Sequence, residues 1–206
     1  MLPGTVTSDA QAFEQVLGRL ESEVGTILGL IPAAKAGGLW KDTAPLWALV
    51  RMMFPVAESL ADLIYRKDND TAENLRKVLA NEFEAVRPGS YRGKAATLTL
   101  LFRHSLTHTD ELRMLAAGGR NVGWLLSYGR PTEHMKLVKA NATSFGIHFD
   151  TTAFYEDLVK VCRNAQAGTW GGDVMRRYNG WLTLTIDANP NPKGLKKEAI
   201  AEMAAF

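Results

Sequence analysis

The chain has 206 residues, with 46% hydrophobic side chains, 22% charged side chains and a net charge of +2. These values lie near the globular average and exclude a disordered, fibrous or disulfide-scaffold protein, while the length suits a single main core. The lone Cys162 and the absence of a basic, apolar leader predict a cytoplasmic protein, and charges within the most apolar window, 46–64, indicate no membrane span.

The first third of the chain predicts two long amphipathic helices. Apolar residues recur at three- and four-residue steps over 8–31, and Pro32 should end this helix. A second apolar stripe covers 44–66, where Pro55 should introduce a kink because it lacks an N–H and crowds the preceding turn.

Three further helices are expected before residue 120. Asp70 opens a D-x-x-E start for a helix over 70–87, and Pro88-Gly89 should stop it. The apolar pattern then predicts a helix over 90–102. Thr109 is a good cap for a shorter helix ending at Gly118-Gly119.

The pattern changes after Gly119. Short alternating segments separated by Gly, Pro and Asn predict a small β-hairpin or meander, formed by 122–128, 135–138 and 146–149. A helix should follow from 150–152 to Gly168, and the alternation over 181–186 is typical of a strand.

These elements predict a mainly α protein, a bundle of four to five helices with a small β region in its C-terminal half. We expect one domain over 1–187, with its core at 8–118 and the β addition and a helix at 120–187. Residues 188–206 should form a C-terminal extension with a short helix, after the breaker Asn189-Pro190-Asn191-Pro192.

Charge is distributed unevenly along the chain. Residues 86–139, here called the basic island, carry nine basic and three acidic side chains, a balance of +6. Such an excess favours a partner rich in phosphate, such as RNA or a nucleotide, although a solvated basic face is the alternative. The island residues expected to bind nucleic acid are Arg87, Arg92, Lys94, Arg113 and Arg120.

A short motif lies inside the basic island. Arg103 and His108 have R-x4-H spacing, and the polar His104 directly follows the arginine. With a kinked helix and a helix ending in Pro-Gly before it, the chain resembles the HEPN superfamily over roughly residues 44 to 165. That resemblance implies a helical bundle that is either a metal-independent ribonuclease or a non-catalytic relative.

The motif has a chemical rationale. An arginine fork matches the geometry of phosphate, and a histidine titrates near neutrality, so Arg103 would hold the phosphate and His108 would act as acid and base, with His104 as a polar helper. On one straight helix, five residues turn by about 500°, which leaves Arg103 and His108 about 140° apart. The resemblance implies that two copies share one site, so we expect a homodimer.

Other interpretations remain open. The family resemblance equally allows a non-catalytic module that binds RNA or nucleotides or serves as a dimeric interaction domain, and a neutralising partner protein is a further expectation. A helical scaffold unrelated to the family, with the arginine and histidine merely exposed at a helix end, is another interpretation.

His104 and His108, four residues apart, have two-histidine metal spacing, but the usual helical glutamate is missing. A third ligand would come from Asp110, Glu111, His134 or His148. We therefore expect no bound metal and no cofactor.

Overall fold

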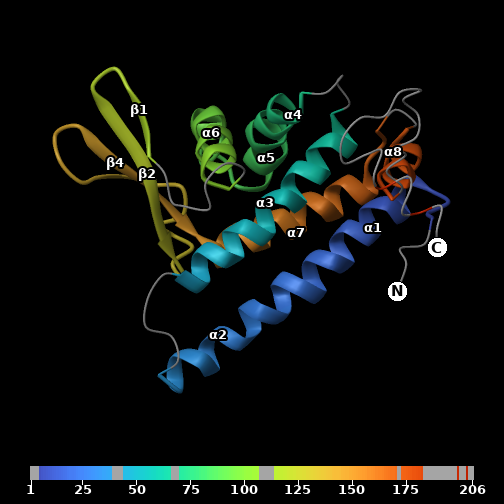
Figure 1. Ribbon diagram of the computed structural model, residues 1–206, viewed down its shortest axis with the longest axis horizontal. Coiled ribbons are helices and arrows are strands. Elements are labelled where there is room, and N and C mark those ends of the chain that lie inside the picture. Colours follow the sequence, from blue (N-terminus) through green and yellow to red (C-terminus); the bar gives the residue numbers. More distant parts are fainter. Residues whose placement is uncertain are drawn as a thin grey trace.

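The computed structural model describes residues 5–38, 44–65, 70–106, 114–170 and 173–182, together with Ala199 and Met203. Within these ranges the chain forms six helices, if the continuous segments α1–α2 and α4–α5 each count as one helix. One four-stranded sheet lies in the C-terminal half (Figure 1). The predicted mainly α class with a small β region is confirmed, but the number of helices is six rather than four to five. None of the helices in the described ranges is long and apolar enough to cross a membrane.

The first helix is longer than predicted. It comprises α1 (Asp9–Arg19), a π-helical stretch (Leu20–Gly25) and α2 (Thr26–Ala36), and the Ser8 side chain caps it by accepting from the Gln11 N–H. The predicted end at Pro32 is wrong. Proline removes one hydrogen bond here, only one turn from the end of α2, while Leu28 and Ile31 in that segment are buried.

The next three helices follow the predicted order. They are α3 (Ala44–Ile64), then α4 (Thr71–Val78) continued by a π turn (Leu79–Phe83) and α5 (Glu84–Val86), then a 3-10 turn (Arg92–Lys94) leading into α6 (Ala95–Leu106). The Asp70 cap is confirmed, because its side chain accepts from the Glu73 N–H. Gly89 has φ +80° in the α5–α6 connection, a conformation that favours glycine at the predicted stop.

The sheet is more complex than a meander. Its strands are β1 (Leu115–Ala117), β2 (Arg120–Ser127), β3 (Leu137–Lys139) and β4 (Ser144–Asp150), in the order β1-β2-β4-β3. The two outer pairs are antiparallel, whereas β2 and β4 are parallel, with Trp124 opposite Ile147. The long connection from β2 to β3 therefore crosses one end of the sheet.

Two helices complete the described chain. They are α7 (Thr151–Ala167), which begins where predicted and is capped by the Asp150 side chain, and α8 (Val174–Trp181). The predicted strand over 181–186 is wrong at Trp181, which ends a helix that buries Val174 and Tyr178, and 183–186 lie outside the described residues. The 188–206 extension also lies outside them, apart from Ala199 and Met203.

The predicted helix ending at Gly118-Gly119 is also wrong. Leu115–Ala117 is strand β1, and the start at Thr109 lies outside the described residues. Both glycines have positive φ, +57° and +71°. Two successive residues of this kind suit a tight hairpin between antiparallel strands, so the glycine pair links β1 to β2 instead of ending a helix.

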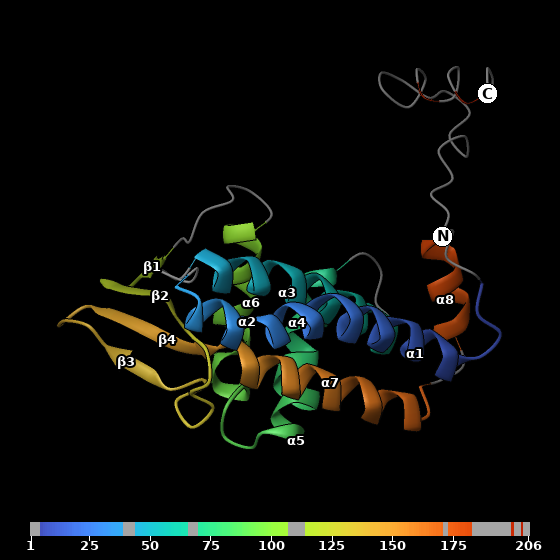
Figure 2. The same ribbon diagram turned by 90° about the horizontal axis from the view of Figure 1, so that it is seen from below.

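Helix α7 packs against α1, α3 and α5. It lies along α1 and α3, while α3 also contacts α4, and α4 contacts α6. Both views show the sheet at one end of this assembly and α8 at the other, beside α1 (Figures 1 and 2). Gly25 permits close approach of α7, because a Cβ there would lie 2.6 Å from the Tyr155 hydroxyl. Cys162 of α7 is buried in the core, and this burial raises the pKa of its thiol to about 12.

An aromatic cluster joins the helices to the sheet. Phe54 of α3 is fully buried and stacks on Phe102 of α6 at 4.1 Å and on Phe154 of α7 at 4.9 Å between ring centroids. It also contacts Trp124 of β2 and Phe149 of β4. One side chain thus contacts four elements that come from both halves of the chain.

We expect Phe54→Ala to lower the free energy of unfolding by about 3–5 kcal/mol, because it removes buried apolar area and leaves a cavity among rings that cannot collapse. Leu100→Ala is the control, since Leu100 lies on α6 but is 48% exposed. Urea denaturation measures both changes. Equal, small losses for the two variants would contradict a core centred on Phe54.

Candidate functional site

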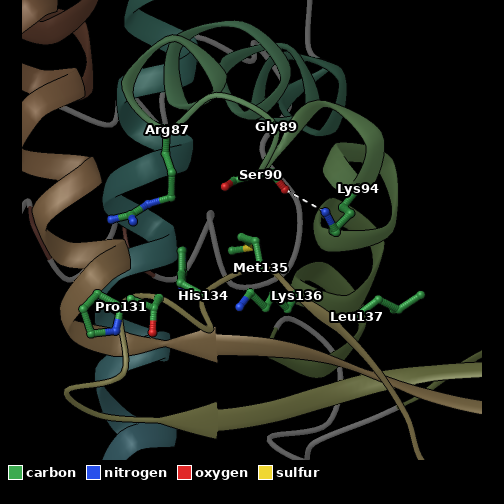
Figure 3. Close-up of a pocket in the computed structure, with 10 residues that line it drawn as sticks. Arg87, Gly89, Ser90, Lys94, Pro131, His134, Met135, Lys136 and Leu137 are labelled. Carbon is green, nitrogen blue, oxygen red and sulfur yellow. Dashed lines mark hydrogen bonds between the residues drawn. The ribbon is translucent and has the colours of Figure 1, made fainter.

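A cavity of about 580 Å³ lies between two connections, one joining α5 to α6 and the other joining β2 to β3 (Figure 3). The first connection contributes Arg87, Gly89, Ser90 and Lys94. The second contributes Pro131, Thr132, His134, Met135 and Lys136, and Leu137 at the start of β3 also lines the cavity. The cavity thus forms where the helical part of the chain meets the end of the sheet.

The lining is strongly positive. Arg87, Lys94 and Lys136 all border the cavity, and no aspartate or glutamate is among the described residues that line it. The Lys94 ammonium donates to the Ser90 carbonyl at 3.0 Å, which holds it beside the opening (Figure 3). Asp157 balances the charge of Arg87 from behind the lining, and the two lysines leave a positive excess that favours an anionic occupant.

The connection from α5 to α6 is shaped by Glu84. Its carboxylate accepts from the backbone N–H groups of Gly89, Tyr91 and Arg92 at 2.6, 2.8 and 2.9 Å. Burial raises the pKa of Glu84, but these three hydrogen bonds outweigh it and lower the pKa overall. These three amide groups of the α5–α6 connection are therefore already occupied and are not available to an anion in the cavity.

A buried polar network forms the wall behind the cations. Asp157 of α7, with only 1% of its side chain exposed, accepts from Arg87 Nε at 2.6 Å and Nη2 at 2.9 Å. The Tyr91 hydroxyl donates to the same carboxylate at 2.7 Å. The hydrogen bonds to Asp157 raise the pKa of Arg87, and burial followed by the Asp157 charge raises the pKa of Tyr91 well above its usual value. Arg87 is thereby fixed in place and Tyr91 stays protonated.

His134 completes the network. Its Nδ1 accepts from the backbone N–H of Asp150 at 3.0 Å, which assigns the ring proton to Nε2, 2.8 Å from the Tyr91 oxygen. Burial, reinforced by the Arg87 charge, lowers the pKa of His134 to about 3. The ring is therefore neutral near pH 7 and positions Tyr91 instead of exchanging protons with a ligand.

The loop around His134 is strained. Met135 has φ +61°, an uncommon conformation for a residue with a side chain, and it is 2% exposed. Its N–H donates to the His148 carbonyl at 2.7 Å, and the His148 N–H donates to the Lys136 carbonyl at 2.8 Å. The His148 ring pairs with Glu133 at 2.9 Å. This turn places His134 against the network while Lys136 borders the cavity.

The structure brings some of the predicted nucleic-acid residues together and separates others. Arg87 and Lys94 line the cavity, whereas the exposed Arg92 donates to the Ala80 carbonyl and does not line it. Arg120 is the first residue of β2, and the cavity lies near the last. Because β2 spans eight residues, its two ends are roughly 25 Å apart. The Arg120 guanidinium instead lies 6.0 Å from the centre of the Phe145 ring. Arg113 lies outside the described residues.

The R-x4-H motif is described only in part. Arg103 lies on α6, partly buried, roughly 14 Å along the helix from Lys94. Burial raises the pKa of Glu58 on α3, and the nearby Arg103 charge partly offsets that rise. The His104 side chain and all of His108 lie outside the described residues.

The residues proposed as further metal ligands have other roles or are not described. His134 bonds the Tyr91 hydroxyl and the Asp150 N–H, and His148 pairs with Glu133. Asp110 and Glu111 lie outside the described residues. Among the residues that the structure does describe, no three His, Cys, Asp or Glu side chains are grouped so as to hold a metal ion.

Sequence reasoning missed much of this site. Lys136 belongs to the basic island, but nothing in the sequence distinguishes it from the island's other cations. Tyr91 follows the Pro88-Gly89 stop, and Asp157 lies in a predicted helix where a carboxylate is ordinarily solvated. In the sequence, His134 is distinguished only as a candidate third metal ligand. No local pattern signals that Tyr91, His134 and Asp157 meet behind a cavity that Lys136 borders.

Comparisons with protein-family models, with curated proteins and with solved structures gave no match to this chain. The function must therefore be argued from the site itself.

We expect the pH dependence of stability to show that His134 is neutral in the folded protein. In the unfolded chain the His134 ring takes up a proton near pH 6.5, whereas in the folded protein it does so only near its pKa of about 3. As the pH falls between these values, the unfolded state binds more protons and the free energy of unfolding drops by up to about 1.4 kcal/mol per pH unit from this residue.

His134→Gln, which cannot titrate, should lose less stability than the wild type over this range. Urea denaturation at pH 7, 6, 5 and 4 measures both slopes, so any overall loss in the variant does not affect the comparison. Parallel pH profiles for the two proteins would contradict a neutral, buried His134.

Proposed function

We propose that the protein binds RNA or nucleotides through their phosphate groups, and that the cavity between the α5–α6 and β2–β3 connections is the binding site. The observation that carries this proposal is the set of three cations, Arg87, Lys94 and Lys136, around a cavity whose described lining has no carboxylate. Lysine and arginine side chains supply most of the attraction between proteins and nucleic acids.

The pairing of the cations supports the proposal. Arg87 is neutralised by Asp157, but no salt bridge joins Lys94 or Lys136 to a carboxylate within the described part of the chain. The usual alternative for a basic surface is balance by neighbouring acids, and here that balance extends only to Arg87. Two positive charges therefore remain for a ligand.

Metal-independent RNA cleavage is a second candidate, which depends on the HEPN resemblance. The observation that favours it is the position of Arg103, partly exposed near the end of α6 and inside the basic island. In this proposal Arg103 holds the scissile phosphate, His108 transfers protons and His104 assists. A homodimer would unite the two motifs, because one straight helix cannot direct both groups to one phosphate.

For the binding proposal, we expect Lys136→Glu to weaken binding of a single-stranded RNA by roughly tenfold or more, because a cation is replaced by a repelling charge. Arg19→Glu is the matched control, since it makes the same charge change at an exposed position on α1. Fluorescence anisotropy at about 50 and 200 mM salt measures the affinity and its salt dependence. Equal effects of the two variants, or an affinity independent of salt, would exclude the cavity as the binding site.

For the cleavage proposal, we expect wild-type protein to cut RNA in EDTA and to leave 2′,3′-cyclic phosphate ends, because the 2′-hydroxyl is an internal nucleophile. His108→Ala should lower the rate by roughly 10²–10⁴ through loss of a general acid and base. Arg103→Lys should retain part of the activity that Arg103→Ala loses, since charge remains without the fork. Activity abolished by EDTA and restored by zinc would favour the His104/His108 metal alternative.

A further inference from the structure

The three cavity cations come from separate segments. Arg87 follows α5, Lys94 precedes α6, and Lys136 lies in the connection from β2 to β3. Figure 3 shows Arg87 and Lys94 on opposite sides of the cavity, with Lys136 at a third margin. A surface that follows an RNA backbone presents its cations along a groove. Cations placed around a cavity instead suit one compact, highly charged group.

The available donors match such a group. Arg87 uses Nε and Nη2 on Asp157, which leaves Nη1 without a partner among the described residues. The Lys94 ammonium uses one donor on the Ser90 carbonyl and keeps two, and Lys136 adds its own ammonium. An internal phosphodiester offers two free oxygens and one charge, whereas a terminal phosphate offers three oxygens and a charge of about −1.5 to −2 at pH 7.

The remaining lining fits the group attached to a phosphate. A volume of about 580 Å³ exceeds what a phosphate alone requires and falls in the range of small-ligand sites. Pro131, Met135 and Leu137 supply apolar surface, and the Ser90 and Thr132 side chains carry hydroxyl groups. Arg87 is held by the buried Asp157 carboxylate, which balances its charge, so its remaining donor is already fixed before a ligand enters.

From this geometry, and resting on the proposed phosphate-binding function, we infer that the cavity takes a terminal phosphomonoester in preference to an internal phosphodiester. Two sources supply this chemistry, a mononucleotide and the phosphorylated end of an RNA strand. Both place one dianionic phosphate among Arg87, Lys94 and Lys136, with the attached sugar and base against the apolar lining.

The test compares one short single-stranded RNA bearing a 5′-hydroxyl, a 5′-phosphate or a 3′-phosphate. We expect a terminal phosphate to raise the affinity by roughly tenfold or more over the hydroxyl form, because the phosphate adds at least one charged contact. Lys94→Gln and Lys136→Gln should remove this preference. Arg92→Gln should retain it, because Arg92 lies in the same connection but does not line the cavity. Thermal unfolding of each variant verifies that the fold is kept.

Competition identifies the source. Displacement of the phosphorylated RNA by AMP, but not by adenosine, assigns the site to free nucleotides as well as RNA ends, and failure of AMP to compete assigns it to RNA ends; a phosphate preference supports the inference in both cases. AMP binding by a protein that binds no RNA also supports it. Salt-sensitive RNA binding with equal affinity for phosphate and hydroxyl ends, and no binding of AMP, would overturn the inference and keep the proposed function. No binding of any RNA or of AMP would overturn both.

Discussion

The buried carboxylate of Asp157 determines how the helical part of the protein is joined to the loop that borders the cavity. A charge with 1% of its surface exposed is costly unless it is paired and hydrogen-bonded. Arg87 supplies the pairing, and Tyr91 supplies a further hydrogen bond and extends the network to His134. The need to pair one buried carboxylate thus sets the relative positions of α7, the α5–α6 connection and the loop after β2.

This network divides the cavity into a fixed wall and adaptable margins. Arg87 is held by two hydrogen bonds to a buried partner, so its guanidinium loses little freedom when a ligand binds. Lys94 and Lys136 are point charges on flexible stems that can adjust to the ligand. His134 remains neutral, because burial beside Arg87 opposes protonation. The positive charge at the cavity therefore comes from lysine and arginine side chains and not from histidine.

The aromatic cluster around Phe54 holds the helices and the sheet together beside this polar network. It joins α3, α6 and α7 to β2 and β4, and ring contacts of His134 with Phe149 and Phe154 connect it to the polar network. Apolar burial supplies most of the stability of such an interface, while the hydrogen-bonded network selects its geometry. A site built on these two components depends on packing between the halves of the chain.

The sequence by itself determined the features that depend on neighbouring residues. The apolar periodicity placed the long helices, and the Asp70 and Asp150 caps marked where two of them begin, because caps and stripes act over three or four residues. The glycine pair 118–119 suits both the end of a helix and the turn of a hairpin. Only the pairing of β1 with β2 decides between these two structures. The cavity was beyond local reasoning altogether. Arg87 and Asp157 are 70 residues apart and Tyr91 and His134 are 43 apart, so their contacts, and the cavity behind which they lie, exist only once the chain has folded.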